Sequence, residues 1–416
     1  MSIPSQLVRP TLLLSICFFA GISRANDLAT APQPQESLQP MLKINWRLGT
    51  DLPQGFQDSD GGILRSRLIT VGGFCSGGLE EDNRRKPGRY PRGFLQKSWA
   101  LDLDRASREW TSLPDFPGAA RQALSAALVE DALYFWGGFS YDAPYCYADG
   151  WRLTHEGNQW RWSQLPDFPW KINSAALAVV GSRIYACGGS DYNAERFFTE
   201  TDREGEIEGL GSRLLVFDTG ATEAGWRELP RCPGTPRWVH TMTSVDGQLY
   251  VIGGASGETI REGTSVGYCT IVDNWKFDTE QESWTRLRDL PVASGNFPRS
   301  TNNVFQNRYI ILPGGYQYGH VLNPDGTLRQ PYGQVHSANP NSGLCNDVFV
   351  YDIQANLFGT ADSLPIDNNL PMTVVRDDSI YLIGGETGGG VVDGQYYGHH
   401  PDLLLIGTIE AINNPQ

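Results

Sequence analysis

Several patterns that would assign the chain to a common class of protein are missing from its sequence. After the N-terminal segment, no apolar run reaches the roughly 18 residues that a membrane-spanning helix needs. Basic residues number 33 against 47 acidic ones, which gives a net charge of −14. Such a surface repels nucleic acid and anionic membranes. We therefore expect no nucleic-acid partner and, once the N-terminal segment is cleaved, no membrane partner.

Cysteine is scarce, and its seven positions are far apart. The spacing contains no Cys-x-x-Cys pair, which excludes a zinc knuckle and a dithiol redox motif. Cys187 ends the apolar run Ile184–Cys187, so we expect it to be buried as a small hydrophobic residue. An exported chain permits disulfides, and Cys232 with Cys269 is the pair that we expect to form one.

Catalytic and cofactor motifs are missing as well. The chain has no Gly-x-Ser-x-Gly turn and no His-Glu-x-x-His spacing. The glycine-rich stretch Gly384–Gly390 is not followed by Lys-Ser or Lys-Thr, so it is not a nucleotide-binding loop. His399 and His400 are adjacent, and adjacent side chains of a strand point to opposite sides. We therefore predict no metal site and no cofactor.

The N-terminus has the pattern of a secretory signal peptide. Residues 11–21 form an apolar run that is too short to span a bilayer, and Ser23-Arg24-Ala25 places small residues two apart. We predict a signal peptide over residues 1–25, a flexible leader over 26–41, one domain over 42–411 and a tail over 412–416. An uncleaved anchor is the alternative. The predicted location is exported, either periplasmic or extracellular.

Glycine, by contrast, is abundant and recurs in register. Six glycine pairs each follow four largely apolar residues, and successive pairs are 51 to 70 residues apart. A variable loop and a second apolar stretch come next, followed in three units by the pattern Trp-x-x-Leu-Pro and in a fourth by Trp-x-x-Leu. The six runs are Leu68–Gly73, Leu133–Gly138, Ile184–Gly189, Leu249–Gly254, Ile310–Gly315 and Ile380–Gly385.

These repeats predict an all-β, six-bladed propeller. The strand before each diglycine is apolar throughout because neighbouring blades cover both its faces, and glycine lets the chain leave it with φ > 0. The Trp and Leu of the last pattern are expected to pack between blades. The sixth unit lacks that pattern, and Asn45–Leu48 supplies it. We therefore expect the N-terminal strand to complete the last blade, which removes the free edges of an open sheet.

Long loops and cationic side chains gather on one face of the predicted propeller. Four loops that follow a diglycine exceed about 12–15 residues, a length typical of functional loops. They are Phe74–Lys97, Ser190–Gly211, Ala255–Asp273 and Tyr316–Leu344. The loops after Leu-Pro lie on the same face, and their guanidinium groups match carboxylates. The face is therefore predicted to bind a small anionic molecule through Arg121, Arg237, Arg299, Trp238 and Asn296.

The diglycines and their Trp-x-x-Leu-Pro partners resemble Kelch repeats over about residues 42–411. Among Kelch proteins the chain looks like the bacterial N-acetylneuraminate epimerases, which are sialic acid mutarotases. Three stretches carry this resemblance: Gly384–Gly389 in the last blade, Tyr192–Glu200 in the third and Tyr332–Asn339 in the fifth. The resemblance implies an exported enzyme that interconverts the anomers of sialic acid, or of a similar acidic sugar, without a cofactor.

Mutarotation opens and recloses a hemiketal ring, which requires an acid and a base. The family is thought to use a Glu and an Arg of the fourth blade, and the resemblance extends these roles to Glu258 and Arg261. In the family pattern the Glu directly follows the strand, where this chain has Ala255. The predicted acid–base residues are Glu258, Glu386 and His240. The sugar carboxylate would suit Arg121, Arg237, Arg261 or Arg299.

Two other functions remain open at this stage. The same face could bind a glycan or a protein partner without turnover. A copper oxidase of the galactose oxidase type also has Kelch blades, but it needs two Tyr, two His and a crosslinked Cys, for which no local motif is present. A carboxyl group that faces the central channel within reach of the arginines would favour the enzyme.

Overall fold

The regular secondary structure of the computed structural model is almost entirely β-strand. The chain divides into two units, residues 1–30 and 31–416, and every residue described belongs to the second. Two 3-10 turns, η1 (Leu210–Ser212) and η2 (Thr222–Ala224), are the helical elements of the described part. Within that part, no helix has the length and apolar character needed to cross a membrane. The described residues are 38–77, 92–105, 109–157, 159–191, 209–256, 260–261, 264–265, 269–291, 295, 299, 302–316, 321–322 and 343–412.

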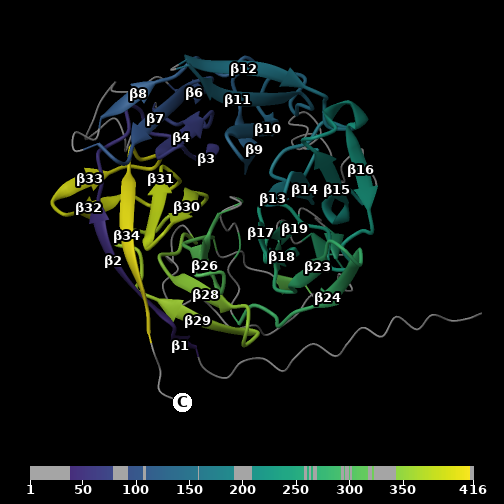
Figure 1. Cartoon of the computed structure of the whole chain (residues 1–416). Helices are drawn as coiled ribbons and strands as arrows, with labels where there is room; N and C mark the ends of the chain where they lie inside the picture. Colours follow the sequence, from purple (N-terminus) through teal and green to yellow (C-terminus); the bar gives the residue numbers. More distant parts are fainter. Residues whose placement is uncertain are drawn as a thin grey trace, which may run out of the picture. The chain divides into compact units, whose positions relative to one another are not determined.

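Five four-stranded antiparallel sheets and one five-stranded sheet form a ring of six blades, which confirms the predicted six-bladed propeller (Figure 1). Blade 1 contains β3 (Asp60–Leu64), β4 (Arg67–Val71), β7 (Ser98–Asp102) and β8 (Trp110–Ser112). Blade 2 contains β9 (Gln122–Val129), β10 (Ala132–Phe139), β11 (Gly150–Glu156) and β12 (Gln159–Leu165). Blade 3 contains β13 (Ala176–Val180), β14 (Arg183–Cys187), β15 (Leu214–Asp218) and β16 (Trp226–Leu229).

The remaining three blades have the same order of strands, from the centre of the ring outward. Blade 4 contains β17 (Thr241–Val245), β18 (Gln248–Ile252), β23 (Trp275–Asp278) and β24 (Ser283–Arg286). Blade 5 contains β25 (Val304–Phe305), β26 (Tyr309–Pro313), β28 (Val348–Asp352) and β29 (Leu357–Ala361). Blade 6 contains β30 (Met372–Arg376), β31 (Ser379–Ile383), β34 (Leu404–Ala411) and, as its outer strand, β2 (Leu42–Leu48).

The N-terminal strand closes the ring, as the sequence predicts. β2 pairs antiparallel with β34, with Trp46 opposite Gly407. The outer edge of blade 5 differs from the prediction, because Gln39–Pro40 form a short strand, β1, parallel to β29. These two residues fall in the range expected to be a flexible leader. Pairing with the edge of blade 5 orders them.

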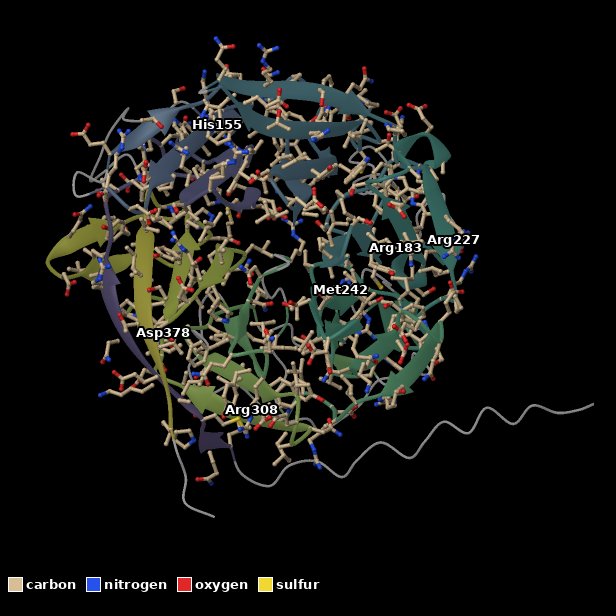
Figure 2. The ribbon with its side chains drawn as sticks, viewed as in Figure 1. His155, Arg183, Arg227, Met242, Arg308 and Asp378 are labelled. Carbon is tan, nitrogen blue, oxygen red and sulfur yellow. The ribbon has the colours of Figure 1, made fainter. Side chains whose placement is uncertain are left out.

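Apolar packing joins each blade to the next. Six clusters of buried apolar residues lie at the six junctions between neighbouring blades. Tryptophans of the outer strands add a second link, since Trp162 Nε1 donates to the carbonyl oxygen of Pro114 and Trp284 Nε1 to that of Pro230. The predicted packing of the Trp-x-x-Leu-Pro pattern between blades is therefore confirmed. Figure 2 shows Arg227 on the outer edge of the ring and Met242 on an inner strand.

The diglycines are required by the junctions between blades. At Gly384-Gly385, φ is 62° and 101°, and the Gly385 amide donates to the carbonyl oxygen of Phe56 in the next blade. A Cβ added to Gly384 would lie 2.4 Å from that oxygen. Gly137-Gly138 has the same conformation and makes the same contact to the carbonyl oxygen of Ile172. The glycines therefore serve the close approach of neighbouring blades and need no ligand to explain them.

Short extra strands occupy the loops that follow the diglycines. They are β5 (Phe74–Cys75), β6 (Gly93–Phe94), β19 (Ala255–Ser256), β20 (Ile260–Arg261), β21 (Thr264–Ser265), β22 (Cys269–Ile271), β27 (Val321–Leu322), β32 (Gly390–Val392) and β33 (Gln395–Tyr397). β22 and β27 pair in parallel, which links the loop of blade 4 to the loop of blade 5. Much of the four long loops lies outside the described residues.

The cysteines are buried as thiols. Cys187 is buried in blade 3, as predicted. The predicted Cys232–Cys269 disulfide is absent, because both residues are free thiols. Cys232 instead lies in the apolar cluster between blades 3 and 4, which also contains Cys187, whereas Cys269 belongs to β22 of the loop sheet.

Candidate functional site at the mouth of the channel

The chain enters the innermost strand of the blades in one repeated way. The residue that begins this entry has a left-handed backbone in every blade where it is described: Asp58, Ala123, Ser174, Val239 and Leu370, with φ between 46° and 58°. Backbone hydrogen bonds run between successive positions, from the amide of Ala123 to the carbonyl oxygen of Asp58 and from Ser174 to Ala123. The repeat therefore sets side chains from different blades around one mouth of the central channel.

Asp58 and Arg299 form a buried ion pair across this mouth. Arg299 Nη2 lies 2.5 Å from Asp58 Oδ1, and only 4% of each side chain is exposed. Gln122 of blade 2 donates to the other carboxylate oxygen at 3.4 Å. Burial raises the pKa of Asp58, although the charge of Arg299 opposes the shift. Arg299 Nη1 is buried and has no hydrogen-bond partner within the described part of the chain.

Glu386 lies beside this ion pair and is not on the outer rim. Its backbone pairs with that of Asn369, and Asn369 Nδ2 donates to Glu386 Oε2 at 3.0 Å. His399 Nε2 is 3.3 Å from Glu386 Oε1. After burial, the charge of Glu386 is a further cause of the raised pKa of Tyr316, and it acts in the same direction on Asp58. With 27% of its side chain exposed, Glu386 combines access from solvent with electrostatic contact to blades 1 and 5.

The sequence reasoning missed Asp58. Its signal was present, because Asp58 follows Leu52-Pro53 as the other candidates follow their Leu-Pro pairs. The N-terminal copy of that loop leads out of the closing strand, so it lies outside the loops from which the candidate residues come. Asp60, two residues on, is structural: its two carboxylate oxygens accept hydrogen bonds from the amides of Gly61 and Ala126. Burial raises the pKa of Asp60 to about 6.

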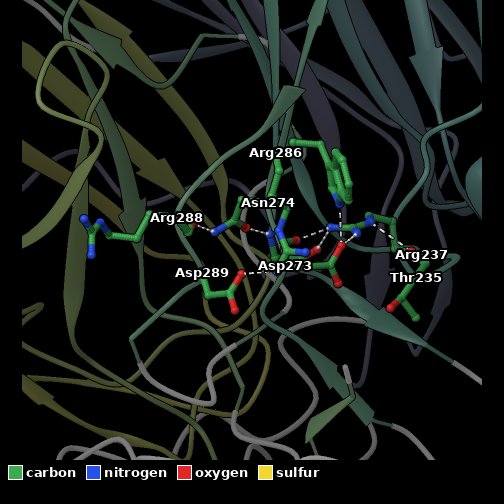
Figure 3. A network of polar contacts seen from close by, with 9 residues as sticks. Thr235, Arg237, Asp273, Asn274, Arg286, Arg288 and Asp289 are labelled. Carbon is green, nitrogen blue, oxygen red and sulfur yellow. Dashed lines mark hydrogen bonds and ion pairs between the residues drawn. The ribbon is translucent and has the colours of Figure 1, made fainter. Parts of the chain in front are cut away.

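Arg121 and Arg237, by contrast, are built into the scaffold. Arg237 Nη2 is 2.6 Å from Asp273 Oδ2, and both side chains are fully buried. Its other nitrogens donate to the carbonyl oxygens of Thr235, Gly253 and Asp273 (Figure 3). Trp275 Nε1 donates to the same oxygen of Asp273. These partners occupy the guanidinium group, so the substrate-binding role predicted for Arg237 is not supported.

Blade 2 repeats this arrangement around Arg121. Its guanidinium bonds both oxygens of Asp149 and the carbonyl oxygens of Ala119 and Gly137, and Trp151 Nε1 donates to Asp149 Oδ2. The Arg121 guanidinium also lies 3.6 Å from the centre of the Tyr147 ring. The predicted role of Arg121 in substrate binding is therefore replaced by a structural one. The shared signal is an Asp two residues before the Trp of the third strand.

His240 is likewise enclosed. Its side chain is fully buried next to the diglycines of blades 3 and 4, where a Cβ added to Gly188 would lie 2.7 Å from its ring. Burial lowers its pKa well below the usual 6.5, with the charges of Arg237 and Arg299 acting in the same direction. Neither ring nitrogen has a described partner or reaches solvent. The acid–base role predicted for His240 is therefore not supported.

The other predicted residues divide into two groups. Trp238 is half-buried, and its backbone pairs with Ala255. Glu258, Asn296 and the side chain of Arg261 lie outside the described residues. Their predicted roles therefore stay predictions.

His399 and His400 lie differently from the prediction. They form a bend after β33 and are not in a strand, so the alternation of side chains does not apply. Their rings stack with centres 4.4 Å apart and planes 25° apart. One ring nitrogen of each and one carboxylate oxygen of Glu386 all lie within 4.8 Å of one another. The expectation that these histidines diverge was wrong.

A second hollow opens at the opposite end of the channel. It has a volume of about 850 Å³ and is lined by the hairpin turns of blades 1, 5 and 6, including Ser66, Gln306 and Asp378. These turns join the first and second strands, whereas Glu386 follows the second strand at its other end. The buried ion pair and the unpartnered guanidinium nitrogen belong to the mouth at Asp58 and not to this hollow. We place the candidate site there because chemistry, and not volume, distinguishes it.

Comparison with known proteins agrees with this architecture. The Kelch motif matches residues 237–291, which cover blade 4. The chain is a six-bladed propeller with a Kelch motif in its fourth blade. It is 23% identical to the N-acetylneuraminate epimerase of Haemophilus influenzae strain 86-028NP over 82% of this chain and 88% of that protein. The epimerase of Pasteurella multocida is 23% identical over 71% of this chain and 81% of its own length.

Other Kelch proteins are also similar to this propeller. Kelch-like protein terF of Aspergillus terreus is 23% identical over 67% of this chain and 53% of its own length. Among solved structures, that of YjhT superposes with a TM-score of 0.56 at 15% identity, covering 83% of this chain and 98% of that one. At this identity the structural likeness shows the fold and leaves the chemistry to the site.

Proposed function

We propose that this Kelch propeller is an acid–base mutarotase of sialic acid or a similar acidic sugar. The observation that carries the proposal is the Asp58–Arg299 ion pair with Glu386 beside it at the mouth of the channel. The epimerase relatives, which are named for N-acetylneuraminate, supply the substrate class. Fold alone would not support the proposal, since Kelch propellers serve many functions.

Arg299 is the proposed anchor for the sugar carboxylate. Its Nη1 is buried and has no described partner, while Nη2 is held by Asp58. A carboxylate at Nη1 would satisfy a cationic donor that otherwise remains desolvated and unpaired. Because the carboxylate of a sialic acid is attached to the anomeric carbon, this anchor also fixes the reacting atom near Asp58 and Glu386.

The two carboxyl groups would then share the proton transfers. Asp58, whose pKa is raised by burial, would transfer a proton to the ring oxygen as the bond from that oxygen to the anomeric carbon breaks, and its contact with Arg299 would then be a hydrogen bond to the neutral acid. Glu386 takes the proton of the anomeric hydroxyl, which becomes the carbonyl of the open-chain keto acid. Rotation presents the other face of the carbonyl, and the reverse transfers close the ring as the second anomer.

Export is proposed alongside this activity. The N-terminal 25 residues have the signal-peptide pattern described above, and N-terminal sequencing of the protein recovered from a periplasmic fraction tests it. We expect the recovered chain to begin at Asn26. A chain that begins at Met1 would contradict cleavage and leave the mutarotase proposal to its own test.

Proton NMR of a freshly dissolved single anomer of N-acetylneuraminate tests the activity. We expect micromolar protein to accelerate the approach to the equilibrium anomer ratio far beyond the spontaneous rate in the same buffer. Line broadening of the sugar signals without acceleration would indicate a glycan-binding module. If the protein neither accelerates the exchange nor binds the sugar, the proposed substrate is refuted.

A further inference from the structure

A hairpin brings a carboxylate and two histidines together from separate parts of blade 6. β32 and β33 pair antiparallel, and their turn at Asp393-Gly394 has positive φ at both residues. The hairpin returns the chain so that Thr387 donates its amide to the carbonyl oxygen of His399. Glu386 before the hairpin and His399-His400 after it therefore become neighbours.

The contacts of His399 fix which ring nitrogen carries the hydrogen. Its Nδ1 lies 3.1 Å from the carbonyl oxygen of Thr387, which can only accept a hydrogen bond. Nδ1 therefore carries the hydrogen of that bond, which leaves Nε2 as the nitrogen that faces Glu386 Oε1 at 3.3 Å. Either a proton on Nε2 or a metal ion between the two atoms satisfies this contact. A histidine that donates its far nitrogen to a backbone carbonyl is also the usual orientation of a metal ligand.

His400 supplies an independent sign of a missing partner. Only 8% of the residue is exposed, and its Nδ1 is buried with no hydrogen-bond partner within the described part. The ring is wedged between His399 and Phe74, whose ring centre is 5.6 Å away. A buried imidazole nitrogen without a hydrogen-bond partner lowers the stability of the fold unless a ligand or ion binds it.

We infer that Glu386, His399 and His400 form a binding site for a divalent transition metal, with zinc as the best match. Two imidazoles and one carboxylate are a ligand set that zinc accepts, with a fourth position left for water or a ligand. The three ligand atoms lie within 4.8 Å of one another, which small side-chain rotations can close to a coordination sphere. Calcium and magnesium prefer oxygen ligands, so two imidazoles disfavour them.

The site would set a limit on the proposed activity. Glu386 cannot take a proton while its oxygen is bound to a metal. Bound zinc is therefore expected to inhibit mutarotation, and a chelator to restore it. The inference itself does not depend on the sugar, because metal binding is measured without it.

The test is titration of the full, untagged chain with Co²⁺, followed by its visible ligand-field absorption and by competition with Zn²⁺. We expect one Co²⁺ per chain and its displacement by Zn²⁺. His399→Asn and His400→Asn should each weaken binding by about 10-fold or more, since even loss of an outer-shell partner costs about 10- to 100-fold. His155→Asn removes a histidine of blade 2 that lies against Trp160 and should leave binding unchanged.

Two results would overturn the inference: no one-to-one site in the wild type, or a site that persists in His399→Asn. In either case the contact of His399 with Glu386 is an ion pair held by a proton. Because His399 is about one-third exposed, its variant keeps the test valid if the buried His400 variant fails to fold. Near-ultraviolet circular dichroism of each variant checks folding first.

Discussion

Two buried arginine–aspartate pairs look alike in the sequence and differ in what surrounds them. Arg237 and Arg299 each follow a Leu-Pro pair in the sequence, and both bond an aspartate in the interior. Arg237 has four hydrogen bonds to protein atoms, spread over its three nitrogens. Arg299 has one to Asp58 and a buried nitrogen that bonds no described atom. The saturated pair holds blade 4 together, and the unsaturated pair can receive a ligand.

The difference comes from the aspartate and the backbone around it. Asp273 precedes Trp275 in the same blade, so its position is fixed by the repeat, and the arginine fills the space beside the diglycine. Asp58 belongs to blade 1, on the segment that closes the ring, and it meets Arg299 across the channel mouth. A pair within a blade is part of the scaffold, whereas a pair between distant blades is available to change with a ligand.

Removing the saturated arginine should produce the largest effect. Arg237→Ala leaves Asp273 buried without its cation, so the free energy of unfolding is expected to fall by about 3 to 5 kcal/mol. Urea unfolding followed by tryptophan fluorescence measures it. The matched control is Arg227→Ala, because that side chain is 63% exposed in its pair with Glu282 and should change stability by less than about 1 kcal/mol. Equal losses in both variants would contradict the structural role of Arg237.

Glu386→Gln should affect turnover and leave the fold intact. The amide keeps the size of the side chain but cannot take a proton, and loss of a general base typically slows a reaction about 10²- to 10⁴-fold. Anomer exchange measured by NMR at saturating sugar, with the melting temperature of the same sample, separates the two effects. Glu410→Gln on the exposed face of β34 is the control. Wild-type exchange in Glu386→Gln would remove this residue from the mechanism.

Arg299→Lys should weaken sugar binding more than it slows turnover. Lysine retains the charge toward Asp58 but lacks the second nitrogen that would bind the sugar carboxylate. We expect KM to rise about 10- to 100-fold with a smaller change in kcat, which corresponds to about 1.4 to 2.7 kcal/mol of binding. Steady-state rates over a range of sugar concentrations give both constants. An unchanged KM would place the carboxylate elsewhere.

The smallest predicted effect is a dependence of stability on pH through Asp60. Its folded-state pKa is about 6 and lies above the unfolded value of 3.8, so protonation favours the folded state. The stability from this group is present below pH 3.8 and is lost as the pH rises through 6. The stability difference between wild type and Asp60→Asn should therefore shift by about 1 to 3 kcal/mol between pH 4 and pH 7, measured by urea unfolding. A constant difference would contradict the raised pKa.

The sequence was sufficient for the fold because the fold is a repeated local pattern. Each diglycine marks a strand end where the next blade approaches, and the missing outer strand of blade 6 pointed to Asn45–Leu48. The site was less predictable because it depends on contacts across the ring. The residues around Arg299 in the sequence do not indicate that it contacts Asp58, which is 241 residues away. The prediction that the His399 and His400 side chains diverge was wrong for a related reason, because the two residues lie in a bend after β33 and side chains alternate only within a strand.

The central claim is that the unsaturated Asp58–Arg299 pair and Glu386 form a mutarotase site. Exchange spectroscopy of equilibrated N-acetylneuraminate tests it most directly, with wild type, Glu386→Gln and Arg237→Lys at equal concentrations of folded protein. We predict accelerated interconversion of the anomers by wild type and by the folded fraction of Arg237→Lys, and none above the spontaneous rate by Glu386→Gln. Equal acceleration by wild type and Glu386→Gln, or none by wild type, would contradict the claim.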